Sequence, residues 1–278
     1  MTDSHSESPL PYAEVIGDPI AHSKSPLIHN FWLEKLGIEA EYRKTHVRHA
    51  ELAAYFLKRR ADPDWLGCNV TIPHKVAVMD YVSDPAEVGR LIGAMNTIAC
   101  ETGGPLIGTN TDAGGFLAPL QAMGWKGKSA LIVGAGGAAR AILYALAQSG
   151  VTDISIMVRS AEKGQALLDR AGVKGRVIGM DAPLPPVDLL VNSSPLGMTG
   201  QPPLRLDLAP LPEDAVVYDI VYAPLDTQLL LDARARGLQT IDGLEMLIGQ
   251  AALAFDIFFD AEAPREHDAE LRALLTAA

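Results

Sequence analysis

The sequence predicts an α/β protein of two domains, from the order in which strands, helices and turns follow one another along its 278 residues. Over residues 12–110, short apolar strands alternate with helices, and a turn at Gly103 and Gly104 predicts a hairpin. Over residues 128–241, the order strand, glycine turn, helix, strand repeats. We therefore expect an N-terminal three-layer α/β domain with a mixed sheet, and a second, doubly wound domain.

The elements of the first region are bounded by cap and turn residues. A strand ends at Val15 and Ile16, and a helix opens at Ser25 and Pro26 and closes at Gly37. The later elements expected from periodicity are a strand over residues 41–47, a helix over 50–60, a strand over 69–73, and a hairpin pairing 96–100 with 106–110.

The second region is expected to hold buried parallel strands and one clear helix. Its expected elements are strands over 130–133, 154–158, 189–191 and 216–221, a helix over 138–149, and proline-rich loops over 183–186 and 202–212. A long helix over 243–259 has a face that could pack on the first region. We therefore predict a discontinuous first domain, residues 1–112 and 243–278, into which the second domain, residues 113–242, is inserted.

Composition and charge limit the classes of molecule that the protein is expected to bind. The chain is 48% hydrophobic and 21% charged, and its net charge of −11 argues against a nucleic-acid footprint or a basic membrane-binding patch. Cys68 and Cys100 are too few for a disulfide framework, residues 1–8 lack the blocks of a signal peptide, and the apolar run 251–259 is too short to span a bilayer. We expect a cytoplasmic protein that binds a small molecule, as a monomer or homodimer.

A glycine turn follows the strand over 130–133. Gly134, Ala135, Gly136, Gly137 and Ala138 lie between a buried strand and a helix, which is the context that a dinucleotide fingerprint requires. The glycines allow a pyrophosphate to approach the helix N-terminus closely. The alternative is a tight strand-to-helix turn without a ligand.

The end of the next strand indicates which dinucleotide binds. NAD sites usually carry an acid there for the ribose 2′-hydroxyl, whereas this chain has Arg159 and Ser160, with Lys163 one turn later. Two cations and a hydroxyl suit a 2′-phosphate and favour NADP, because each charge-assisted hydrogen bond is worth about 1.5 to 3 kcal/mol. The alternative is a solvated cluster at a helix start, and Glu162 keeps NAD as the rival cofactor.

The segment NVTIPHK, residues 69–75, places a lysine where helix electrostatics do not favour one. Pro73 suits the first turn of a helix, and Lys75 would then lie near the positive end of the helix dipole, at a cost of roughly 0.3 to 1 kcal/mol. Asn69 and Thr71 share one face of the preceding extended segment. The three polar side chains predict a site for a polar small molecule.

Two further segments supply hydroxyl and carboxylate groups. Ser25 precedes Pro26 and alone is best read as an N-cap, whereas Ser23 has no such explanation, and together they could hold a carboxylate. Asp112 is either a helix cap or a partner for Lys75, since the hairpin would bring it near Asn96. The Gln250 amide lies in an apolar helix, where internal bonding explains it as well as a ligand does.

The histidines indicate no metal site. His46 and His49 have helical spacing, but no third ligand is evident, so we expect no metal. His74 is expected to decorate a helix start rather than to act as a base.

In this order, the motifs resemble those of the shikimate dehydrogenase family, from about residue 12 to residue 259. The segments that carry the resemblance are 23–25 (SKS), 69–75 (NVTIPHK), 93–97 (GAMNT), 110–112 (NTD), 134–140 (GAGGAAR), 192–198 (NSSPLGM), 222–224 (YAP) and Gln250. Two departures stand out, because the usual Asn-Arg-Thr is Val158-Arg159-Ser160 and the usual Tyr-Asn-Pro is Tyr222-Ala223-Pro224. Val158 weakens the NADP assignment by one hydrogen bond, and Ala223 affects local loop geometry.

The resemblance implies a substrate domain joined to a Rossmann-type, NADP-binding domain, and reversible reduction of 3-dehydroshikimate to shikimate. Lys75 and Asp112 would be the catalytic pair, with Lys75 exchanging a proton with the substrate oxygen. Shikimate would be bound by Ser23, Ser25, Asn69, Thr71, Lys75, Asn96, Asp112, Tyr222 and Gln250. NADP would contact Gly134, Ala135, Gly136, Gly137, Ala138, Arg159, Ser160, Lys163, Ile220 and Gly243. Two rival interpretations are an NAD-preferring quinate/shikimate dehydrogenase and a regulatory paralogue that binds the same ligand without catalysis.

Overall fold

The computed structural model describes residues 9–100 and 104–277 and divides the chain into two compact units. The first unit consists of Met1–Ala86, Met95–Thr109 and Ala254–Ala278, and the second of Glu87–Ala94 and Asn110–Leu253. Both units are α/β, as predicted. The predicted domain bounds stay a prediction.

The first unit is built on a five-stranded mixed sheet, called sheet A. Its strands are β1 (Tyr12–Gly17), β2 (Glu41–His46), β3 (Trp65–Val70), β4 (Thr97–Cys100) and β5 (Leu106–Thr109), in the order β2-β1-β3-β4-β5. β1 runs parallel to β2 and β3, whereas β4 is antiparallel to both of its neighbours. The predicted hairpin is confirmed, with Thr97 opposite Thr109. Of its predicted turn, Gly103 lies outside the described residues.

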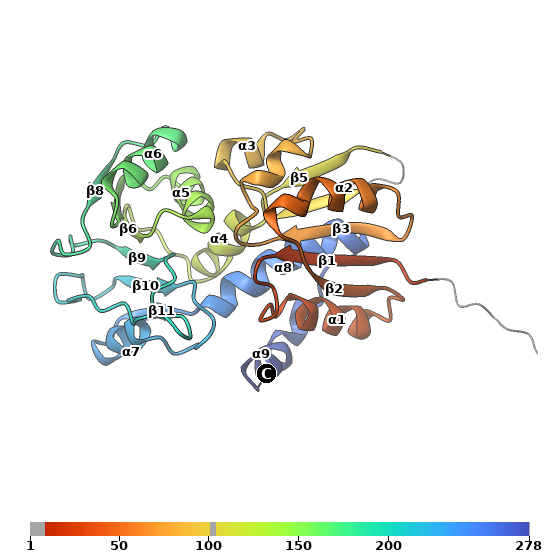
Figure 1. The fold of residues 1–278 in the computed structure, drawn as a ribbon. Coiled ribbons are helices and arrows are strands. Elements are labelled where there is room, and N and C mark those ends of the chain that lie inside the picture. Colours follow the sequence, from red (N-terminus) through yellow and green to blue (C-terminus); the bar gives the residue numbers. More distant parts are fainter. Residues whose placement is uncertain (1–8, 101–103, 278) are drawn as a thin grey trace, which may run out of the picture. The chain divides into compact units, whose positions relative to one another are not determined.

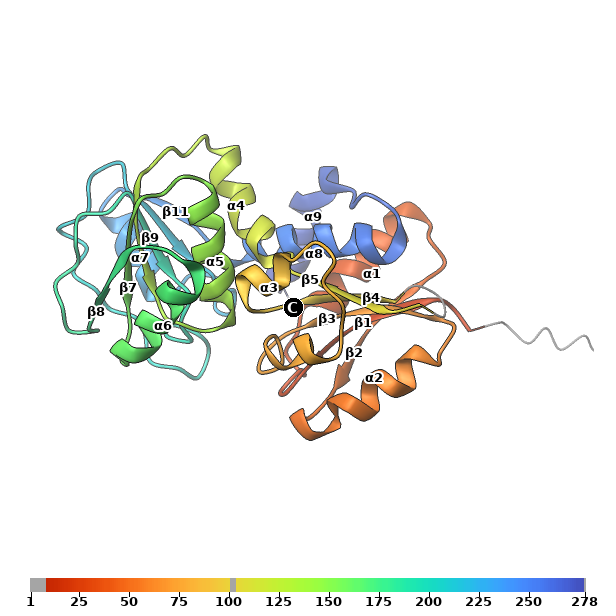
Figure 2. The ribbon, with the colours of Figure 1, turned by 90° about the horizontal axis from the view of Figure 1, so that it is seen from above.

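Helices cover both faces of sheet A, which confirms the three layers (Figures 1 and 2). They are α1 (Ser25–Leu36), α2 (Leu52–Arg60) and α9 (Asp268–Ala277), with the short 3-10 turns η1 (His49–Glu51), η2 (Ala77–Asp80) and η3 (Arg265–His267). Successive residues of β1 alternate between the faces. Val15 packs with Tyr42 and Phe258 on the α1 side, and Ile16 packs with Phe56 on the α2 side.

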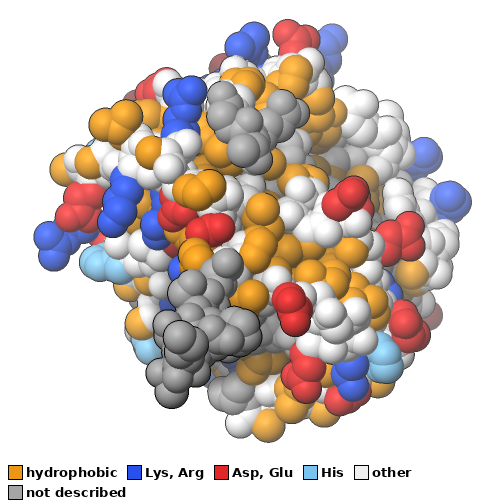
Figure 3. Space-filling model, turned by 90° about the vertical axis from the view of Figure 1, so that its right-hand side faces the viewer, with side chains coloured by type: hydrophobic (Ala, Val, Ile, Leu, Met, Phe, Trp, Pro, Cys, Tyr) orange, Lys and Arg blue, Asp and Glu red, His pale blue; other side chains and the backbone are white. Residues whose placement is uncertain are grey.

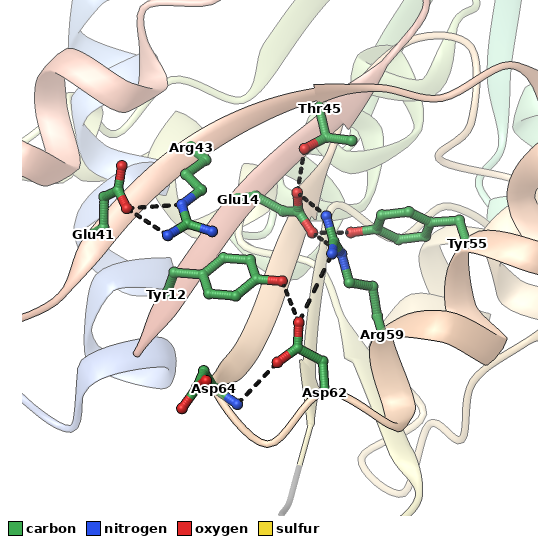
Figure 4. A network of polar contacts seen from close by, with 9 residues as sticks. All are labelled: Tyr12, Glu14, Glu41, Arg43, Thr45, Tyr55, Arg59, Asp62 and Asp64. Carbon is green, nitrogen blue, oxygen red and sulfur yellow. Dashed lines mark hydrogen bonds and ion pairs between the residues drawn. The ribbon is translucent and has the colours of Figure 1, made fainter. Parts of the chain in front are cut away.

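A charged residue, Glu14, lies on β1 of sheet A and is fully buried (Figure 4). Arg59 of α2 forms two hydrogen bonds with its carboxylate, from Nε at 2.6 Å and from Nη2 at 3.0 Å. The Tyr55 hydroxyl donates to Oε1 at 2.7 Å, and the Thr45 hydroxyl donates to Oε2. Because the buried charge has a cation and several donors, it is compensated and attaches α2 to the sheet.

The second unit is built on a six-stranded parallel sheet, called sheet B. Its strands are β6 (Ser129–Val133), β7 (Asp153–Met157), β8 (Gly175–Ile178), β9 (Leu189–Asn192), β10 (Val216–Asp219) and β11 (Gln239–Ile241), in the order β11-β10-β9-β6-β7-β8. Counted from β6 along the chain, this is the order 3-2-1-4-5-6 of the Rossmann fold. The predicted doubly wound domain is confirmed, and β8 and β11 are strands that the sequence pattern did not predict.

Helices also cover both faces of sheet B. The helices of this unit are α3 (Val88–Ile92), α4 (Asp112–Ala122), α5 (Gly137–Gln148), α6 (Ala161–Ala171), α7 (Gln228–Ala235) and the greater part of α8 (Gly243–Phe259). Phe116 of α4, Ile142 of α5 and Leu167 of α6 belong to one hydrophobic core. Leu229 and Leu230 of α7 belong to the core on the opposite face. In residues 9–100 and 104–277, none of the helices has both the length and the apolar character needed to cross a membrane.

Candidate active site

Polar residues of the first unit gather where the parallel strands of sheet A end and β4 begins. Asn69 is the next-to-last residue of β3, and Asn96 directly precedes β4. Both side chains are buried, at 5% and 2% exposure, and the Asn69 amide nitrogen donates to the Asn96 carbonyl oxygen at 3.2 Å. The structure therefore brings together two of the predicted substrate residues.

Thr71 is held beside the end of β1. Its backbone N–H donates to the Ile16 carbonyl at 2.9 Å, and the Asp18 N–H donates to the Ile72 carbonyl at 3.1 Å. A Cβ atom at Gly17 would lie only 2.6 Å from Thr71 Cγ2 and 2.9 Å from the Ile72 oxygen. Glycine at position 17 therefore allows the close approach that places Thr71 at the same edge as Asn69.

Lys75 does not lie in the first turn of a helix, and this prediction from Pro73 was wrong. β3 ends at Val70, residues 72–76 form turns, and only the 3-10 turn η2 follows. The Lys75 carbonyl accepts a hydrogen bond from Met95 N–H at 2.7 Å. Because this tertiary partner occupies the carbonyl, no α-helical ladder continues from Lys75, and the helix dipole does not explain its position.

The two serines before α1 differ from their predicted roles. Lys24 is the N-cap of α1 and Ser25 is already helical, so reading Ser25 as the N-cap was wrong. Ser23 has a structural role after all, because its hydroxyl oxygen accepts the Ser25 N–H at 3.3 Å. Ser25 is buried at 7% exposure beside the helix N-terminus.

His74 is part of the core rather than a surface decoration. It is fully buried, and its Nε2 lies 2.6 Å from the Val47 carbonyl. His46 bonds Asp18 at 2.7 Å, whereas His49 stacks on His74. Across the described residues, no group of three His, Cys, Asp or Glu side chains is arranged to hold a metal ion.

In the second unit, Asp112 is the first residue of α4 and is 3% exposed. The N-cap is Thr111, so the cap interpretation of Asp112 was wrong. Asn110 binds the first turn instead, because its Oδ1 accepts the Ala113 N–H at 3.3 Å, and its Nδ2 donates to the Ala94 carbonyl at 2.9 Å. A carboxylate in the first turn is favoured by the helix dipole.

Gln250 lies on α8, where it meets α4. Its Nε2 donates to the Leu247 carbonyl at 2.8 Å. A Cβ at Gly115 of α4 would lie 2.8 Å from Gln250 Cα, so glycine allows the two helices to cross closely. Internal bonding thus accounts for at least one of the two Gln250 amide hydrogens.

The glycine turn lies at the point where the strand order of sheet B reverses, between β6 and β9. Gly134 has a φ of +106°, a conformation that favours glycine. A Cβ there would lie 3.1 Å from both Ser193 Oγ and Ser194 N, whereas a Cβ at Gly136 would meet open space. The turn opens α5 at Gly137, and ligands of such sheets bind at this reversal point.

A buried network ties the loops after β9 and β10 together. The Asn192 amide donates to Asp219 Oδ1 at 2.9 Å, and the Thr227 hydroxyl donates to Asp219 Oδ2 at 2.7 Å. Burial raises the pKa of the Asp219 carboxyl, against the hydrogen bonds that lower it. The Ile220 N–H donates to the Asn192 carbonyl at 3.1 Å. A Cβ at Gly243 would lie 2.5 Å from the Ile220 oxygen, so the two predicted cofactor residues are neighbours.

The cationic cluster lies at the carboxyl end of β7. Arg159 and Lys163 are exposed, and Ser160 caps α6 by accepting the Lys163 N–H at 3.4 Å. This cluster follows the strand next to β6, where a Rossmann domain meets the ribose. On the face shown in Figure 3, by contrast, Lys and Arg side chains stand singly or in small groups among acidic ones.

Comparison with known proteins decides the family. The family models of the shikimate dehydrogenase substrate binding domain, of shikimate / quinate 5-dehydrogenase and of the shikimate 5′-dehydrogenase C-terminal domain match residues 15–98, 117–193 and 243–270. The shikimate dehydrogenase (NADP(+)) of Sphingopyxis alaskensis is 62% identical over 267 residues, which cover 96% of this chain and 97% of that protein. The chain belongs to the shikimate dehydrogenase family.

Solved structures agree with this assignment. Shikimate 5-dehydrogenase of Thermus thermophilus, in complex with NADP(H) and shikimate, is 34% identical with a TM-score of 0.84, over 95% of this chain and 99% of that one. The ligand-free 5-ketofructose reductase of a Gluconobacter species is 32% identical with a TM-score of 0.86, over 96% and 99%. Because a reductase with another named substrate shares the fold, the fold alone does not decide the substrate.

For this member of the shikimate dehydrogenase family, the structure adds residues that the sequence analysis did not single out. Ser193 and Ser194 border the glycine turn, and Tyr42 and Thr97 contact Asn69. The segment 192–198 carried the resemblance, but its position beside the turn depends on the strand order, which no local pattern reveals. Lys75 belongs to the first unit and Asp112 to the second, and their pairing stays a prediction.

Proposed function

We propose that this member of the shikimate dehydrogenase family catalyses the NADP-dependent, reversible reduction of 3-dehydroshikimate to shikimate. The observation that carries the proposal is the 62% identity to an NADP(+)-dependent shikimate dehydrogenase over nearly the whole length of both chains. The parallel sheet of Rossmann order, with its glycine turn at the reversal point, supports a dinucleotide as cofactor.

The residues of the second unit fit NADP. The open space around Gly136 and the N-terminus of α5 suit a pyrophosphate, and the exposed Arg159 and Lys163 suit a 2′-phosphate. Gly134 and Ala135 belong to the same turn and Gly137 and Ala138 begin α5, while Ser160, Ile220 and Gly243 would contact the remaining parts of the cofactor. When bound, NADP accepts or supplies the hydride, so the protein has to orient the substrate and move one proton.

In the proposed mechanism, Lys75 moves that proton. A protonated Lys75 gives a proton to the carbonyl oxygen of 3-dehydroshikimate during reduction and takes it back during oxidation. Asp112 holds the lysine and bonds a substrate hydroxyl. Ser23 and Ser25 would bind the carboxylate at the start of α1, and the hydroxyl groups would meet Asn69, Thr71, Asn96, Tyr222 and Gln250.

Two alternatives are weighed against this proposal. An NAD-preferring quinate/shikimate dehydrogenase would carry an acid after β7, where this chain has Arg159. A regulatory paralogue without catalysis would need neither Lys75 nor Asp112. We also propose a cytoplasmic location, in keeping with the two free cysteines, and a monomer or homodimer.

A spectrophotometric assay at about 340 nm, where reduced nicotinamide absorbs, tests the proposal. Shikimate and quinate are each offered with NADP and with NAD. We expect the highest kcat/KM for shikimate with NADP. A preference for quinate with NAD would support the first alternative, and turnover in none of the four combinations would support the second.

A further inference from the structure

Tyr42 lies on the edge strand β2, yet its side chain is only 2% exposed. The Asn30 side chain of α1 pairs with its backbone, accepting the Tyr42 N–H at 2.8 Å and donating to the Tyr42 carbonyl at 2.9 Å. The His29 ring stacks on the Tyr42 ring, with centroids 3.9 Å apart and planes 3° from parallel. These contacts fix both the backbone and the ring of Tyr42.

The Tyr42 hydroxyl reaches the candidate active site through Asn69. It donates to Asn69 Oδ1 at 2.6 Å, and Asn69 Nδ2 donates to Thr97 Oγ1 at 3.0 Å and to the Asn96 carbonyl at 3.2 Å. The Thr97 hydroxyl in turn donates to Asn96 Oδ1 at 3.1 Å. The four residues form a buried chain of hydrogen bonds, which we call the relay.

The direction of the relay follows from the hydrogen-bonding capacity of its members. The Asn96 carbonyl can only accept, so the nitrogen of the Asn69 amide faces it and the oxygen faces Tyr42. Tyr42 must then donate to that oxygen. The Thr97 hydroxyl accepts a hydrogen from Asn69 and donates its own to Asn96 Oδ1, so each amide is held in one of its two orientations.

This orientation has a consequence for substrate recognition. Both hydrogens of the Asn69 amide are used within the protein, so Asn69 can meet a ligand only as an acceptor through Oδ1. Asn96 Oδ1 accepts the Thr97 hydroxyl, which fixes the orientation of the Asn96 amide as well. A substrate hydroxyl group can donate to Asn69 Oδ1, because an amide oxygen has two lone pairs and Tyr42 uses one of them.

We propose that Tyr42 and Thr97 are positioning residues, which set the Asn69 and Asn96 amides in the orientation that recognises hydroxyl groups of shikimate. This inference rests on the proposed function, because it takes both asparagines as substrate ligands. Without the Tyr42 hydroxyl, the Asn69 amide is held only through its nitrogen and its oxygen loses a donor, so shikimate binding weakens while NADP binding is unaffected.

The test compares Tyr42→Phe with the matched control Tyr55→Phe. Both changes remove one tyrosine hydroxyl that donates to a side-chain oxygen of sheet A, but Tyr55 donates to Glu14, outside the relay (Figure 4). We expect Tyr42→Phe to raise the KM for shikimate about tenfold and to leave the KM for NADP within about twofold of the wild type. In Tyr55→Phe, both constants should stay at the wild-type values.

A second pair of variants tests the relay at Thr97. Thr97→Val removes the hydroxyl with little change of shape and should raise the KM for shikimate as Tyr42→Phe does, whereas Thr97→Ser should restore most of the affinity. Thermal unfolding identifies the variants that remain folded.

The outcomes separate the relay from the proposed function. An active wild type with an unchanged KM for shikimate in folded Tyr42→Phe or Thr97→Val would overturn the relay alone. Equal changes of both KM values in Tyr42→Phe and Tyr55→Phe would also overturn it, because they indicate general loosening of sheet A. A wild type without turnover of shikimate would overturn the proposed function.

Discussion

His29 shows how strongly one side chain can depend on its surroundings. Its ring is fully buried between Tyr42 and the aromatic residues of α1 and α8, and neither ring nitrogen has a hydrogen-bond partner among the described residues. Burial lowers the pKa of His29 from 6.5 to about 3. Between these two pH values, the folded protein therefore holds a neutral imidazole where the unfolded chain carries a charged one.

We predict that this histidine makes the protein sensitive to acid. At this histidine, the unfolded chain binds a proton below about pH 6.5 and the folded protein only near pH 3. The free energy of unfolding is therefore highest above pH 6.5 and decreases as the pH falls from 6.5 to 3. The loss is about 1.4 kcal/mol per pH unit within that window. His29→Phe keeps the stacking and removes the titration, so urea unfolding should show a smaller loss between pH 6.5 and pH 5, by about 2 kcal/mol. Parallel pH profiles of the two proteins would contradict this account.

Lys75 and Asp112 are predicted to act on the chemical step. Lys75→Ala and Asp112→Ala should each lower kcat at least about a hundredfold, because each removes part of the proton transfer. NADPH should still bind, as measured by fluorescence titration, because neither residue belongs to the cofactor turn. Lys58→Ala, which changes an exposed lysine of α2, serves as the control and should keep the wild-type kcat. Near-normal turnover in Lys75→Ala would end the proposal of the catalytic pair.

At the scale of elements, the glycine turn between β6 and α5 is the feature that the sequence predicted best. Its strand, turn, helix and second strand appear in the predicted order, because each depends on residues close together in the chain. The hairpin of β4 and β5 was predictable for the same reason. The helix expected at Pro73 failed, because the Lys75 carbonyl binds Met95, a residue that is distant in the sequence.

The contacts of the turn were less predictable than its existence. That Ser193 and Ser194 lie beside Gly134 follows from the pairing of β6 with β9, and that pairing depends on the whole of sheet B. Likewise, nothing near Tyr42 in the sequence indicates that its hydroxyl meets Asn69. Local patterns thus identified the segments that form the candidate site. Which other side chains contact and orient the site residues depends on long-range packing.

We predict that Gly134→Ala lowers the affinity for NADP. The φ of +106° strains any residue other than glycine, and the added methyl group would press on Ser193 and Ser194. Gly172→Ala is the matched control, because Gly172 also has a positive φ, of +63°, but has open space around its Cβ position at the end of α6. Both variants should lose about 1 kcal/mol of stability, while only Gly134→Ala should raise the Kd for NADP, by about tenfold or more. If the Kd for NADP were the same in Gly134→Ala as in Gly172→Ala, the turn would not contact the cofactor.

At the scale of the whole molecule, the proposed chemistry is divided between the two units. The first unit contains Lys75 and the relay, and the second contains the glycine turn, the cationic cluster and Asp112. The family assignment rests on both, because the matching family models fall within each part of the chain. The proposed hydride transfer needs the substrate residues of the first unit and the cofactor residues of the second, whereas binding of one ligand alone would need only one of these sets.

The most direct test of the central claim is to follow the hydride itself. Shikimate carrying deuterium on the carbon that becomes the ketone is incubated with NADP and the purified protein, and the nicotinamide product is analysed by mass spectrometry. The account predicts NADPH that carries the deuterium, together with 3-dehydroshikimate. Formation of unlabelled NADPH, or of no NADPH, would contradict it.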